Sequence, residues 1–297
     1  MKRVIVSGAT GFVGRRFTEY LLRRGVEVAA LDRRGSLTPL SASGKPSPAA
    51  VFDLTDGTET QDGAYDAFYH FAWQGVNGPE KADPLIQTDN IRLTIECASL
   101  AKRIGCKKFL CAGTVAERAV ESLGHLEKTS GGMMYGAAKH SARLMLEAYC
   151  KSIGLDFVWM QFSNVYGPGN TTGNLVSYTL ASLLNNVEAS FGPAVQPYDF
   201  IYIDDLMEAI CRLGECDTRD HFYFIGSGEP RPLKEYLQLI GRLLGKEHLI
   251  QIGKRPDDGI VYTYDMFDTQ PLSACIGQYT STSFEEGIRL VWEQSGR

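Results

Sequence analysis

The chain has 297 residues, of which 44% are hydrophobic and 22% are charged, so it can bury a sizeable core and its composition excludes intrinsic disorder. A net charge of -5 excludes a global basic field, and we expect neither a nucleic-acid partner nor a membrane partner. Seven cysteines form no CxxC pair, and five histidines do not cluster beside them, which argues against a metal site and a disulfide framework. These features predict a cytoplasmic enzyme with reduced thiols and no metal ion.

Apolar runs alternate with helical patterns through the first half of the chain. Strands are predicted at 3–7, 27–31, 49–52, 67–71, 107–112 and 155–162. Helices are predicted at 12–24, from Lys81 or Pro84 to Arg103, and at 134–152. Strands that alternate with helices at this spacing lie parallel and are joined by crossover helices. The pattern therefore predicts an α/β fold of the Rossmann type, with a doubly wound parallel sheet.

After about residue 165 the alternation becomes looser. Strands are predicted at 200–203 and 222–225, and helices near 205–213, 232–245 and 283–293. We interpret residues 1–165 as one domain and residues 166–297 as a smaller mixed α/β lobe. Segments around 199–228 are expected to return to the first domain.

Three glycines follow the first predicted strand and open the first predicted helix. Gly8 permits a tight turn, Gly11 lets the backbone approach a pyrophosphate, and Gly14 allows the helix to pack closely on the strand. Backbone N–H groups at the start of that helix then face the anion. The strand before the loop and the helix after it predict a dinucleotide site in residues 1–165. A glycine-rich turn without a ligand is the alternative.

An acidic residue ends the second predicted strand. Asp32 stands 18 positions after Gly14, where its carboxylate would accept hydrogen bonds from the adenosine ribose and repel a 2′-phosphate. This favours NAD, although Arg33 and Arg34 could pair with the phosphate of NADP. Asp53 closes the third predicted strand and is placed to contact the adenine amino group, but a turn aspartate fits that position equally well.

A tyrosine and a lysine stand four residues apart on one predicted helix, so Tyr135 and Lys139 share a face. A free tyrosine titrates near ~10, and a nearby cation favours the phenolate, which suits Tyr135 to acid–base work. The ammonium of Lys139 could also hold the nicotinamide ribose. Thr114, at the end of the fifth predicted strand, is the hydroxyl we expect to share the substrate oxygen with Tyr135. A coincidental surface pair is the alternative.

Together these motifs resemble the extended short-chain dehydrogenase/reductases, the NAD-dependent epimerase/dehydratase family. The resemblance covers nearly the whole chain and is carried by residues 8–14, 69–72, 90–91, 135–139, 164–169, 199–205 and 284–288. It implies a bound NAD, a nucleotide-sugar substrate and a homodimer formed through the long helices at about 84–103 and 134–152.

The resemblance also implies roles for single residues. Tyr135 matches the acid/base of the family, Lys139 its ribose-binding lysine, and Thr114 the hydroxyl that bonds the sugar 4-oxygen. The implied cofactor contacts are Gly8, Thr10, Gly11, Phe12, Val13, Gly14, Asp32, Arg33, Asp53, Leu54, Phe71, Ala72, Trp73, Asn90, Tyr135, Lys139 and Val165. The implied substrate contacts are Asn164, Asn174, Leu175, Tyr198 and Arg255.

Four residues depart from the family pattern. Gln161 and Tyr198 stand where members commonly have arginine, so one contact to the substrate diphosphate is expected to be missing. Glu117 and Arg118 stand where many members have Tyr-Gly.

The residues after Thr114 bear on the type of reaction. The family's 4,6-dehydratases follow this threonine with Asp-Glu, whereas Val115 and Ala116 stand here, which disfavours dehydration. A nucleotide-sugar epimerase, acting by transient oxidation at C4, and a 4-keto-sugar reductase remain. Asp32 favours NAD and hence the epimerase. A dinucleotide-binding sensor without catalysis is the alternative of another class, although such sensors typically lose the tyrosine that this chain keeps.

Overall fold

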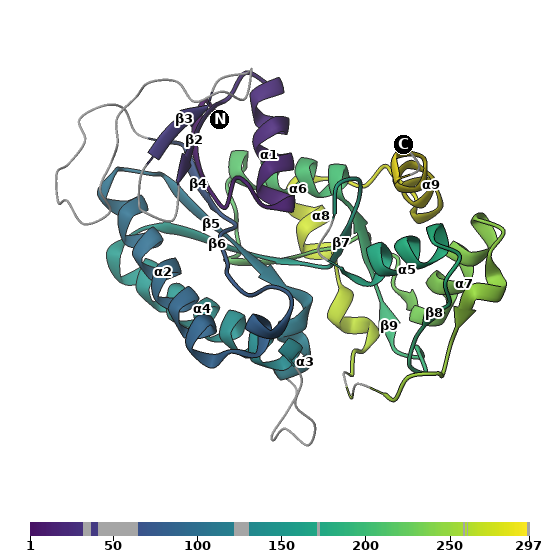
Figure 1. The fold of residues 1–297 in the computed structure, drawn as a ribbon. Helices are drawn as coiled ribbons and strands as arrows, with labels where there is room; N and C mark the ends of the chain where they lie inside the picture. Colours follow the sequence, from purple (N-terminus) through teal and green to yellow (C-terminus); the bar gives the residue numbers. More distant parts are fainter. Residues whose placement is uncertain are drawn as a thin grey trace.

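The computed structural model describes residues 1–31, 37–40, 65–121, 131–170, 173–257, 259 and 261–295. The strand predicted at 49–52 lies outside these residues, as do the predicted cofactor contacts Asp32, Arg33, Asp53 and Leu54. Figure 1 shows a larger lobe built on a central sheet and a smaller lobe that contains the C-terminal helix.

The sheet has seven strands in the order β11-β6-β5-β4-β1-β2-β3. They are β1 (Arg3–Ser7), β2 (Glu27–Leu31), β3 (Leu37–Leu40), β4 (Ala67–His70), β5 (Lys108–Thr114), β6 (Asp156–Phe162) and β11 (Phe222–Ile225). All neighbouring strands are parallel except β2 and β3, which confirms the predicted doubly wound parallel sheet. The antiparallel β3 was not predicted, because its sequence includes Pro39, a residue that sheets accept mainly at their edges.

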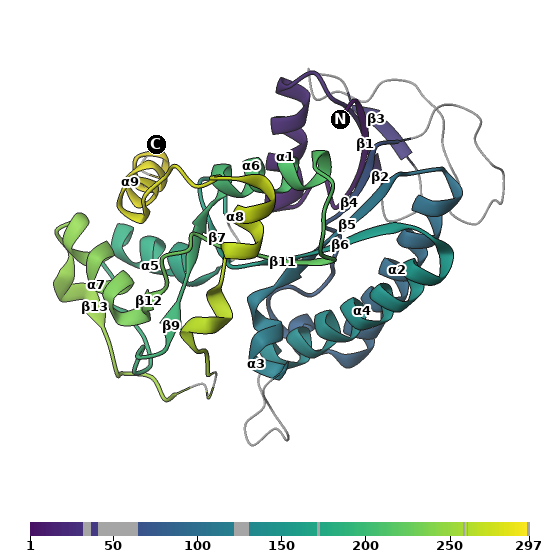
Figure 2. The same cartoon turned by 180° about the vertical axis from the view of Figure 1, so that it is seen from behind.

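Helices cover both faces of the sheet, as Figures 1 and 2 show. The helices α1 (Phe12–Arg23) and α6 (Ile203–Glu215) lie on one face, and α2 (Pro84–Arg103) and α4 (Gly131–Ile153) lie on the other. Along β1, Val4 and Val6 belong to one hydrophobic cluster, while Ile5 between them belongs to the other. Because both faces are covered, the central strands are apolar at nearly every position, and this is why they are visible as continuous apolar runs.

The start of α2 is fixed by a capping residue. Of the two starts predicted, the structure shows the one at Pro84. Asp83 Oδ1 accepts the backbone N–H of Leu85 at 2.9 Å and that of Ile86 at 3.2 Å. An aspartate cap followed by proline at the first helical position is a strong helix start, so the residues before it, Pro79–Ala82, form a separate 3₁₀ turn, η1.

The second half of the chain contributes to both lobes. Strand β11 pairs with β6, and α6 packs on α1, where Arg16 and Asp204 form two hydrogen bonds of 2.8 and 2.9 Å. Residues 166–297 therefore complete the sheet as well as building the smaller lobe. The boundary near residue 165 stays a prediction.

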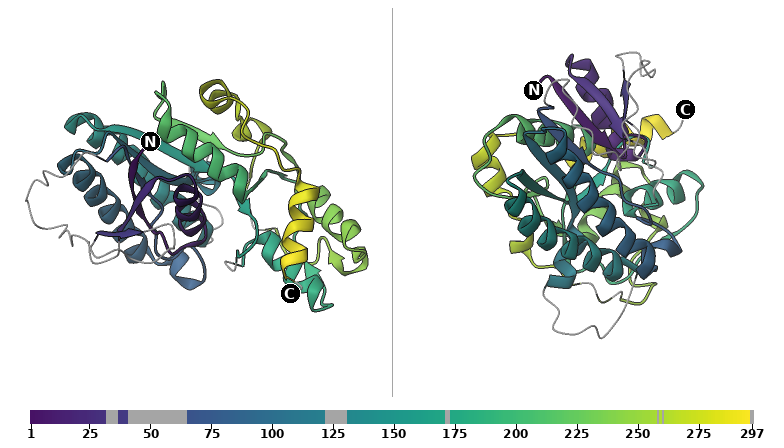
Figure 3. Two further views of the ribbon diagram at one scale, coloured as in Figure 1. Left: turned by 90° about the horizontal axis from the view of Figure 1, so that it is seen from above. Right: turned by 90° about the vertical axis from the view of Figure 1, so that its left-hand side faces the viewer.

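The smaller lobe, seen from two further directions in Figure 3, is built from short elements. Its helices are α5 (Leu175–Leu184), α7 (Leu233–Leu243) and α9 (Phe284–Ser295), with α8 (Gln270–Ile276) packed against β11. Its strand pairs are β7 (Asn164–Tyr166) with β10 (Phe200–Tyr202), β9 (Pro197–Tyr198) with β12 (Arg231–Pro232), and β8 (Ala189–Ser190) with β13 (Ile250–Gln251). The short helical turns η2 (Val115–Glu117) and α3 (Arg118–Glu121) belong to the larger lobe, where both contact α4. The remaining short turns are η3 (Glu247–Leu249) and η4 (Tyr264–Phe267). Among the helices in the described part of the chain, none has the length and apolar character of a membrane span.

Candidate active site

The glycine-rich loop between β1 and α1 has the close contacts that its spacing predicts. Gly8 has a φ of +71°, and a Cβ there would lie 2.7 Å from the backbone nitrogen of Ala72. A Cβ on Gly14 would lie 2.2 Å from the carbonyl oxygen of Gly8, an approach that only glycine permits. A Cβ on Gly11 would meet that same oxygen at 3.3 Å and nothing else within 4 Å. The space beside Gly11, in front of the first turn of α1, therefore suits an anion.

Polar side chains tie the ends of β1 and β4 to α2. Ser7 Oγ and His70 Nδ1 are 2.7 Å apart, and His70 Nε2 lies 3.0 Å from Thr94 Oγ1. Burial lowers the pKa of His70 to about 3, so the imidazole is neutral and bridges the two hydroxyls. Asn90, a predicted cofactor contact, accepts the backbone N–H of Gln74 and donates to the carbonyl of Gln74, both at 2.8 Å. Both polar atoms of this asparagine thus hold the loop after β4.

The segment after β4 forms one wall of the site. The backbone N–H of Phe71 donates to the carbonyl of Ser7 at 3.1 Å, which continues the pairing of β4 with β1. The Trp73 indole N–H donates to Gln87 Oε1 at 2.8 Å and so fixes the ring. The ammonium of Lys139 lies 3.7 Å from the centre of that ring, a cation–π contact. The wall predicted from sequence is therefore joined directly to the predicted catalytic lysine.

The structure brings the three predicted catalytic residues together where β5 ends. Tyr135 and Lys139 lie on α4, and Thr114 is the last residue of β5. The hydroxyl of Thr114 acts on the phenol of Tyr135, whose pKa it lowers. Lys139 is 3% exposed, and its Nζ donates to the carbonyl of Ala112 at 2.7 Å. An ammonium has three protons, so Lys139 keeps donors for a ligand.

The protonation of Tyr135 differs from the expectation that Lys139 favours the phenolate. Burial is the largest effect, and it raises the pKa of Tyr135 above the ordinary value. The charge of Glu117 raises it further, whereas the hydroxyl of Thr114 lowers it. Burial also lowers the pKa of Lys139. The sequence shows the lysine one turn away but does not show which atoms surround the phenol, and these determine the direction of the shift in pKa.

A carboxylate lies behind this site. Glu117 is fully buried, and its Oε1 accepts the backbone N–H of Thr114 at 2.6 Å. Its Oε2 accepts the indole N–H of Trp159 at 3.0 Å. Burial raises the pKa of Glu117, and the positive charges of Lys139 and Arg143 lower it. From the sequence, Glu117 was predicted only to depart from the family pattern, and no role was predicted for it.

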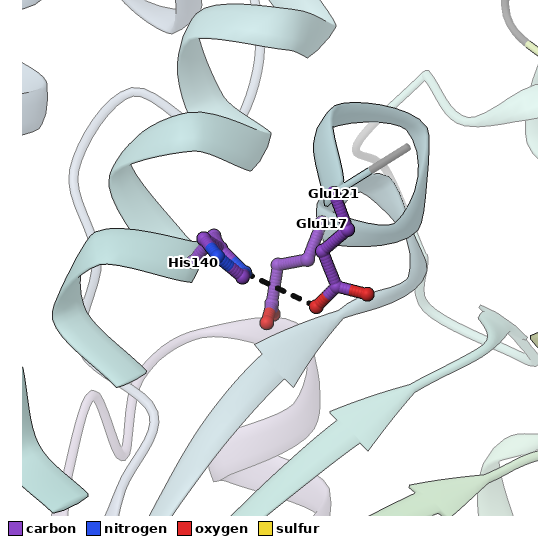
Figure 4. Close-up of side chains that lie close together, drawn as sticks. All are labelled: Glu117, Glu121 and His140. Carbon is purple, nitrogen blue, oxygen red and sulfur yellow. Dashed lines mark hydrogen bonds and ion pairs between the residues drawn. The ribbon is translucent and has the colours of Figure 1, made fainter. Parts of the chain in front are cut away.

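Glu117, Glu121 and His140 come together at this place, as Figure 4 shows. One ligand-type atom from each lies within 4.8 Å of the others, a spacing that suits a cation. Arg143 supplies that cation, because its Nη2 lies 2.9 Å from Glu121 and its Nε lies 3.8 Å from Glu117. We therefore assign this group to an ion-pair network and not to a metal site.

A cavity of about 400 Å³ lies in the smaller lobe, and its lining includes the predicted substrate contacts Leu175, Tyr198 and Arg255. Arg255 Nη2 donates to the hydroxyl of Tyr178 at 2.7 Å, and its guanidinium lies 5.0 Å from the centre of the same ring. Thr114, Tyr135 and Lys139 do not line this cavity. Tyr178 was not predicted, but its position three residues after Leu175 on a helix would have indicated the same face.

The remaining predicted substrate contacts hold the backbone of the smaller lobe. Asn164 Nδ2 donates to the carbonyl of Asp199 at 3.0 Å. Asn174 Nδ2 donates to the carbonyl of Val165 at 2.9 Å, and its Oδ1 accepts the N–H of Ser177 at 2.9 Å as the cap of α5. Of the other predicted cofactor contacts, Thr10 is exposed in the glycine-rich loop, and Phe12 and Val13 lie half-buried in the first turn of α1.

Two curated proteins are similar to this chain in sequence. The UDP-glucuronate 4-epimerase of Thermodesulfobacterium geofontis is 24% identical over 261 residues, which are 82% of this chain and 81% of that protein. UDP-glucuronic acid decarboxylase 1 of Arabidopsis thaliana is 28% identical over 249 residues, which are 76% of this chain and 55% of that protein. The chain thus spans about half the length of the Arabidopsis relative.

Solved structures show the same fold. The UDP-glucose 4-epimerase of Thermotoga maritima has a TM-score of 0.78 and 21% identity, and the match covers 99% of this chain and 98% of that chain. The family model described as "NAD dependent epimerase/dehydratase family" matches residues 4–226, which is more than half of the sequence. The chain belongs to the NAD-dependent epimerase/dehydratase family.

Proposed function

We propose that this protein is an NAD-dependent nucleotide-sugar epimerase that oxidises the 4-hydroxyl of the sugar and returns the hydride to the opposite face. The observation that carries the proposal is the grouping of Thr114, Tyr135 and Lys139 at the carboxyl end of β5. Oxidation and return of the hydride each need one proton carrier, and neither needs a second acid. The grouped residues supply this minimal set.

Tyr135 carries the proton in this proposal. Its phenolate takes the proton of the 4-hydroxyl during oxidation, and the phenol formed in that step donates the same proton back to the sugar 4-oxygen when the hydride returns. Burial raises the pKa of Tyr135, so the phenolate is a strong proton acceptor. The hydroxyl of Thr114 bonds the same oxygen and fixes it beside the phenol. Lys139 keeps its orientation through the carbonyl of Ala112 and the ring of Trp73, and its remaining protons would hold the nicotinamide ribose of a bound NAD.

The glycine-rich loop fits the cofactor. A Cβ on Gly11 would fill the space in front of α1, and the N–H groups of the first turn there have no capping side chain from Gly11. NAD, when bound, supplies the carbon that accepts and returns the hydride. The carboxylate of Asp32 supports NAD over NADP by the argument from sequence, and we expect NAD to bind at least about tenfold more tightly, a difference of ~1.4 kcal/mol.

The structure disfavours dehydration more firmly than the sequence does. Val115 is buried, Ala116 has no acid to offer, and Glu117 directs both carboxylate oxygens into the protein. An acid for elimination must reach the substrate, and none of these three residues provides one. The 4-keto-sugar reductase uses the same grouped residues, and it differs in exchanging its cofactor after each turnover.

The cavity lined by Tyr198 and Arg255 is proposed to hold the nucleotide part of the substrate. Arg255 offers a positive charge for a diphosphate and is oriented by Tyr178. Tyr198 stands in the place of the arginine that many family members have, and its ring favours a base or sugar face over a phosphate. The cavity therefore has one arginine for the diphosphate among its lining residues.

We also propose a homodimer and a cytoplasmic location. Leu144 and Met145 on α4 are 49% and 50% exposed, and Leu85 on α2 is 76% exposed. Exposed large apolar side chains on two neighbouring long helices support pairing of these helices with those of a second copy. All seven cysteines are free, which supports a reducing compartment.

The first test is a search for the substrate. UDP-, GDP-, dTDP- and CDP-sugars are screened for thermal stabilisation, because a ligand at 100 times its Kd adds about 2.7 kcal/mol. Cofactor absorbance of the purified protein separates the two enzymatic alternatives. An epimerase retains NAD through purification and turns over without added cofactor, whereas a reductase consumes reduced cofactor in equal amount to its product.

The second test removes single groups. Tyr135→Phe is expected to lower kcat by about a hundredfold or more, because general acid–base groups contribute ~10²–10⁴-fold. Thr114→Val is expected to cost less, since it removes one hydrogen bond and no proton carrier. Tyr149→Phe, on the same helix, is the matched control and should leave kcat unchanged. Near-normal turnover of Tyr135→Phe would contradict both enzymatic alternatives, and wild-type protein that binds NAD but turns over no nucleotide sugar would favour the sensor.

A further inference from the structure

The buried carboxylate of Glu117 lies close to the end of the strand that carries Thr114. It lies in η2, directly after the strand that ends at Thr114, and it is fully buried. A Cβ on Gly113 would lie 2.2 Å from the indole nitrogen of Trp159 and 2.7 Å from Glu117 Oε1. Glycine at this position therefore makes room for a buried carboxylate directly under the end of β5.

The end of β5 is held from two sides. Lys139 Nζ donates to the carbonyl of Ala112 at 2.7 Å, and the backbone N–H of Thr114 donates to Glu117 Oε1 at 2.6 Å. The three residues from Ala112 to Thr114 thus run between a buried ammonium and a buried carboxylate. Hydrogen bonds to charged groups are the stronger ones, so Glu117 fixes the backbone that carries the catalytic hydroxyl.

The titratable groups on the surrounding elements show which negative charge compensates the positive charge of Lys139. From β4 the lysine faces His70, and from β5 it faces Cys111. Burial lowers the pKa of His70 to about 3 and raises that of Cys111 to about 12, so both are neutral near pH 8. From η2 it faces Glu117 across Trp159: Lys139 Nζ lies 5.9 Å from the centre of the Trp159 ring, and the indole N–H of that ring donates to Glu117 Oε2 at 3.0 Å. The charge of Glu117 raises the pKa of Lys139 against the effect of burial.

Other charged groups face Glu117 rather than Lys139. Arg143 on α4 approaches Glu117 at 3.8 Å and is shared with Glu121 at 2.9 Å and Glu147 at 3.2 Å. Arg118 on α3 reaches Glu121 at 3.3 Å. Arg143 favours the ionised form of Glu117, because a buried carboxylate needs positive charge nearby, whereas Arg118 pairs with Glu121.

We propose that Glu117 is a positioning residue for this site: its buried carboxylate anchors the strand end that carries Thr114 and supplies the negative charge that keeps Lys139 an ammonium ion. Glu117 itself touches neither substrate nor cofactor. The inference rests on the proposed function, because it assumes that Lys139 serves the reaction as a cation.

The test follows the protonation of Lys139 itself and needs neither substrate nor cofactor. The full chain is labelled with ¹³C at the lysine Cε atoms and titrated by NMR from about pH 6 to about pH 10. The resonance that is missing in Lys139→Met identifies Lys139. Removing the negative charge in Glu117→Gln is expected to lower the titration midpoint of Lys139 by on the order of one pH unit.

Glu121→Gln is the matched control, because Glu121 contacts the same Arg143 but not the end of β5. It is expected to move the midpoint by less than about a third as much. Trp159→Phe removes one donor to Glu117 and keeps the ring, so it should move the midpoint in the same direction by a smaller amount, and it serves if Glu117→Gln does not fold. An unchanged midpoint in the folded variant, or an equal shift in Glu121→Gln, would overturn the proposal. Because no turnover is measured, the proposed reaction could fail while this result stands.

Discussion

Replacing Gly14 and Gly11 by alanine separates the two uses of the glycine-rich loop. In Gly14→Ala the new Cβ lies 2.2 Å from the carbonyl oxygen of Gly8 and 2.8 Å from its carbonyl carbon. Both are backbone atoms, so no side chain can rotate away and the loop has to shift by about 1 Å. Overpacking of this kind costs ~1–3 kcal/mol, and a backbone clash belongs at the upper end.

Helix propensity offsets part of this cost. Alanine is better than glycine in a helix by at most ~1 kcal/mol, so Gly14→Ala should lower the free energy of unfolding by about 2 kcal/mol. Gly11→Ala meets one atom at 3.3 Å and has an extended backbone with a φ of -75°, which alanine adopts freely. The free energy of unfolding of Gly11→Ala should stay within ~1 kcal/mol of the wild-type value. Alanine is a poorer N-cap residue than glycine, but it also reduces the conformational entropy of the unfolded chain, and the two effects offset each other.

Two measurements on each variant test this reasoning. Urea unfolding followed by circular dichroism gives the free energies, and calorimetric titration with NAD⁺ gives the affinities. We expect Gly11→Ala to lose at least about tenfold in affinity, or ~1.4 kcal/mol, with little loss of stability. If Gly11→Ala bound NAD⁺ like wild type, the loop would not be the site of the pyrophosphate. If Gly14→Ala were as stable as Gly11→Ala, the close approach to Gly8 would not constrain the fold.

Three further predictions concern the interior and the surface. His70 has a depressed pKa of about 3 in the folded chain, whereas the unfolded chain takes up a proton near pH 6.5, so the stability contributed by this group falls as the pH drops through that window. The stability difference between wild type and His70→Asn should therefore change by about 2 kcal/mol between pH 7 and pH 5 in urea titrations, and a constant difference would contradict the burial argument. Gly113→Ala drives a Cβ to 2.2 Å from the Trp159 indole nitrogen, and we expect a loss of ~1–3 kcal/mol, measured by urea unfolding. Leu144→Glu combined with Met145→Glu should convert a dimer to a monomer in light scattering with unchanged circular dichroism, and a wild-type monomer at micromolar concentration would refute the proposed interface.

Much of the larger lobe could be predicted, because its signals are local in sequence. The central strand β1, for example, is covered on both faces, and its residues Val4, Ile5 and Val6 are therefore apolar without interruption. The helix at Leu175–Leu184 was missed for the opposite reason, because no charged residue marks its solvent face. The pairing of Asn164–Tyr166 with Phe200–Tyr202 joins distant segments, and periodicity carries no information about which strands become partners.

In the candidate site too, features that depend on contacts between distant segments could not be predicted from the sequence. The spacing of Tyr135 and Lys139 predicted their common face, since helix geometry alone determines it. The sequence could not show the direction of Glu117, because that depends on Trp159 from another strand and on the space left by Gly113. The direction of the pKa shift at Tyr135 could not be derived from the sequence for a related reason, because burial is a property of the folded chain.

The place of β11 in the sheet affects how the chain can acquire its structure during synthesis. The strand at Phe222–Ile225 covers the edge of the strand that ends at Phe162, about 60 residues earlier. A nascent chain that stops before Phe222 therefore exposes the unpaired N–H and C=O groups of a long apolar strand, which is a surface prone to aggregation. Ribosome-bound fragments of the first 165 residues should thus stay incompletely folded and bind chaperones, and the sheet should become resistant to protease only once Ile225 has left the exit tunnel.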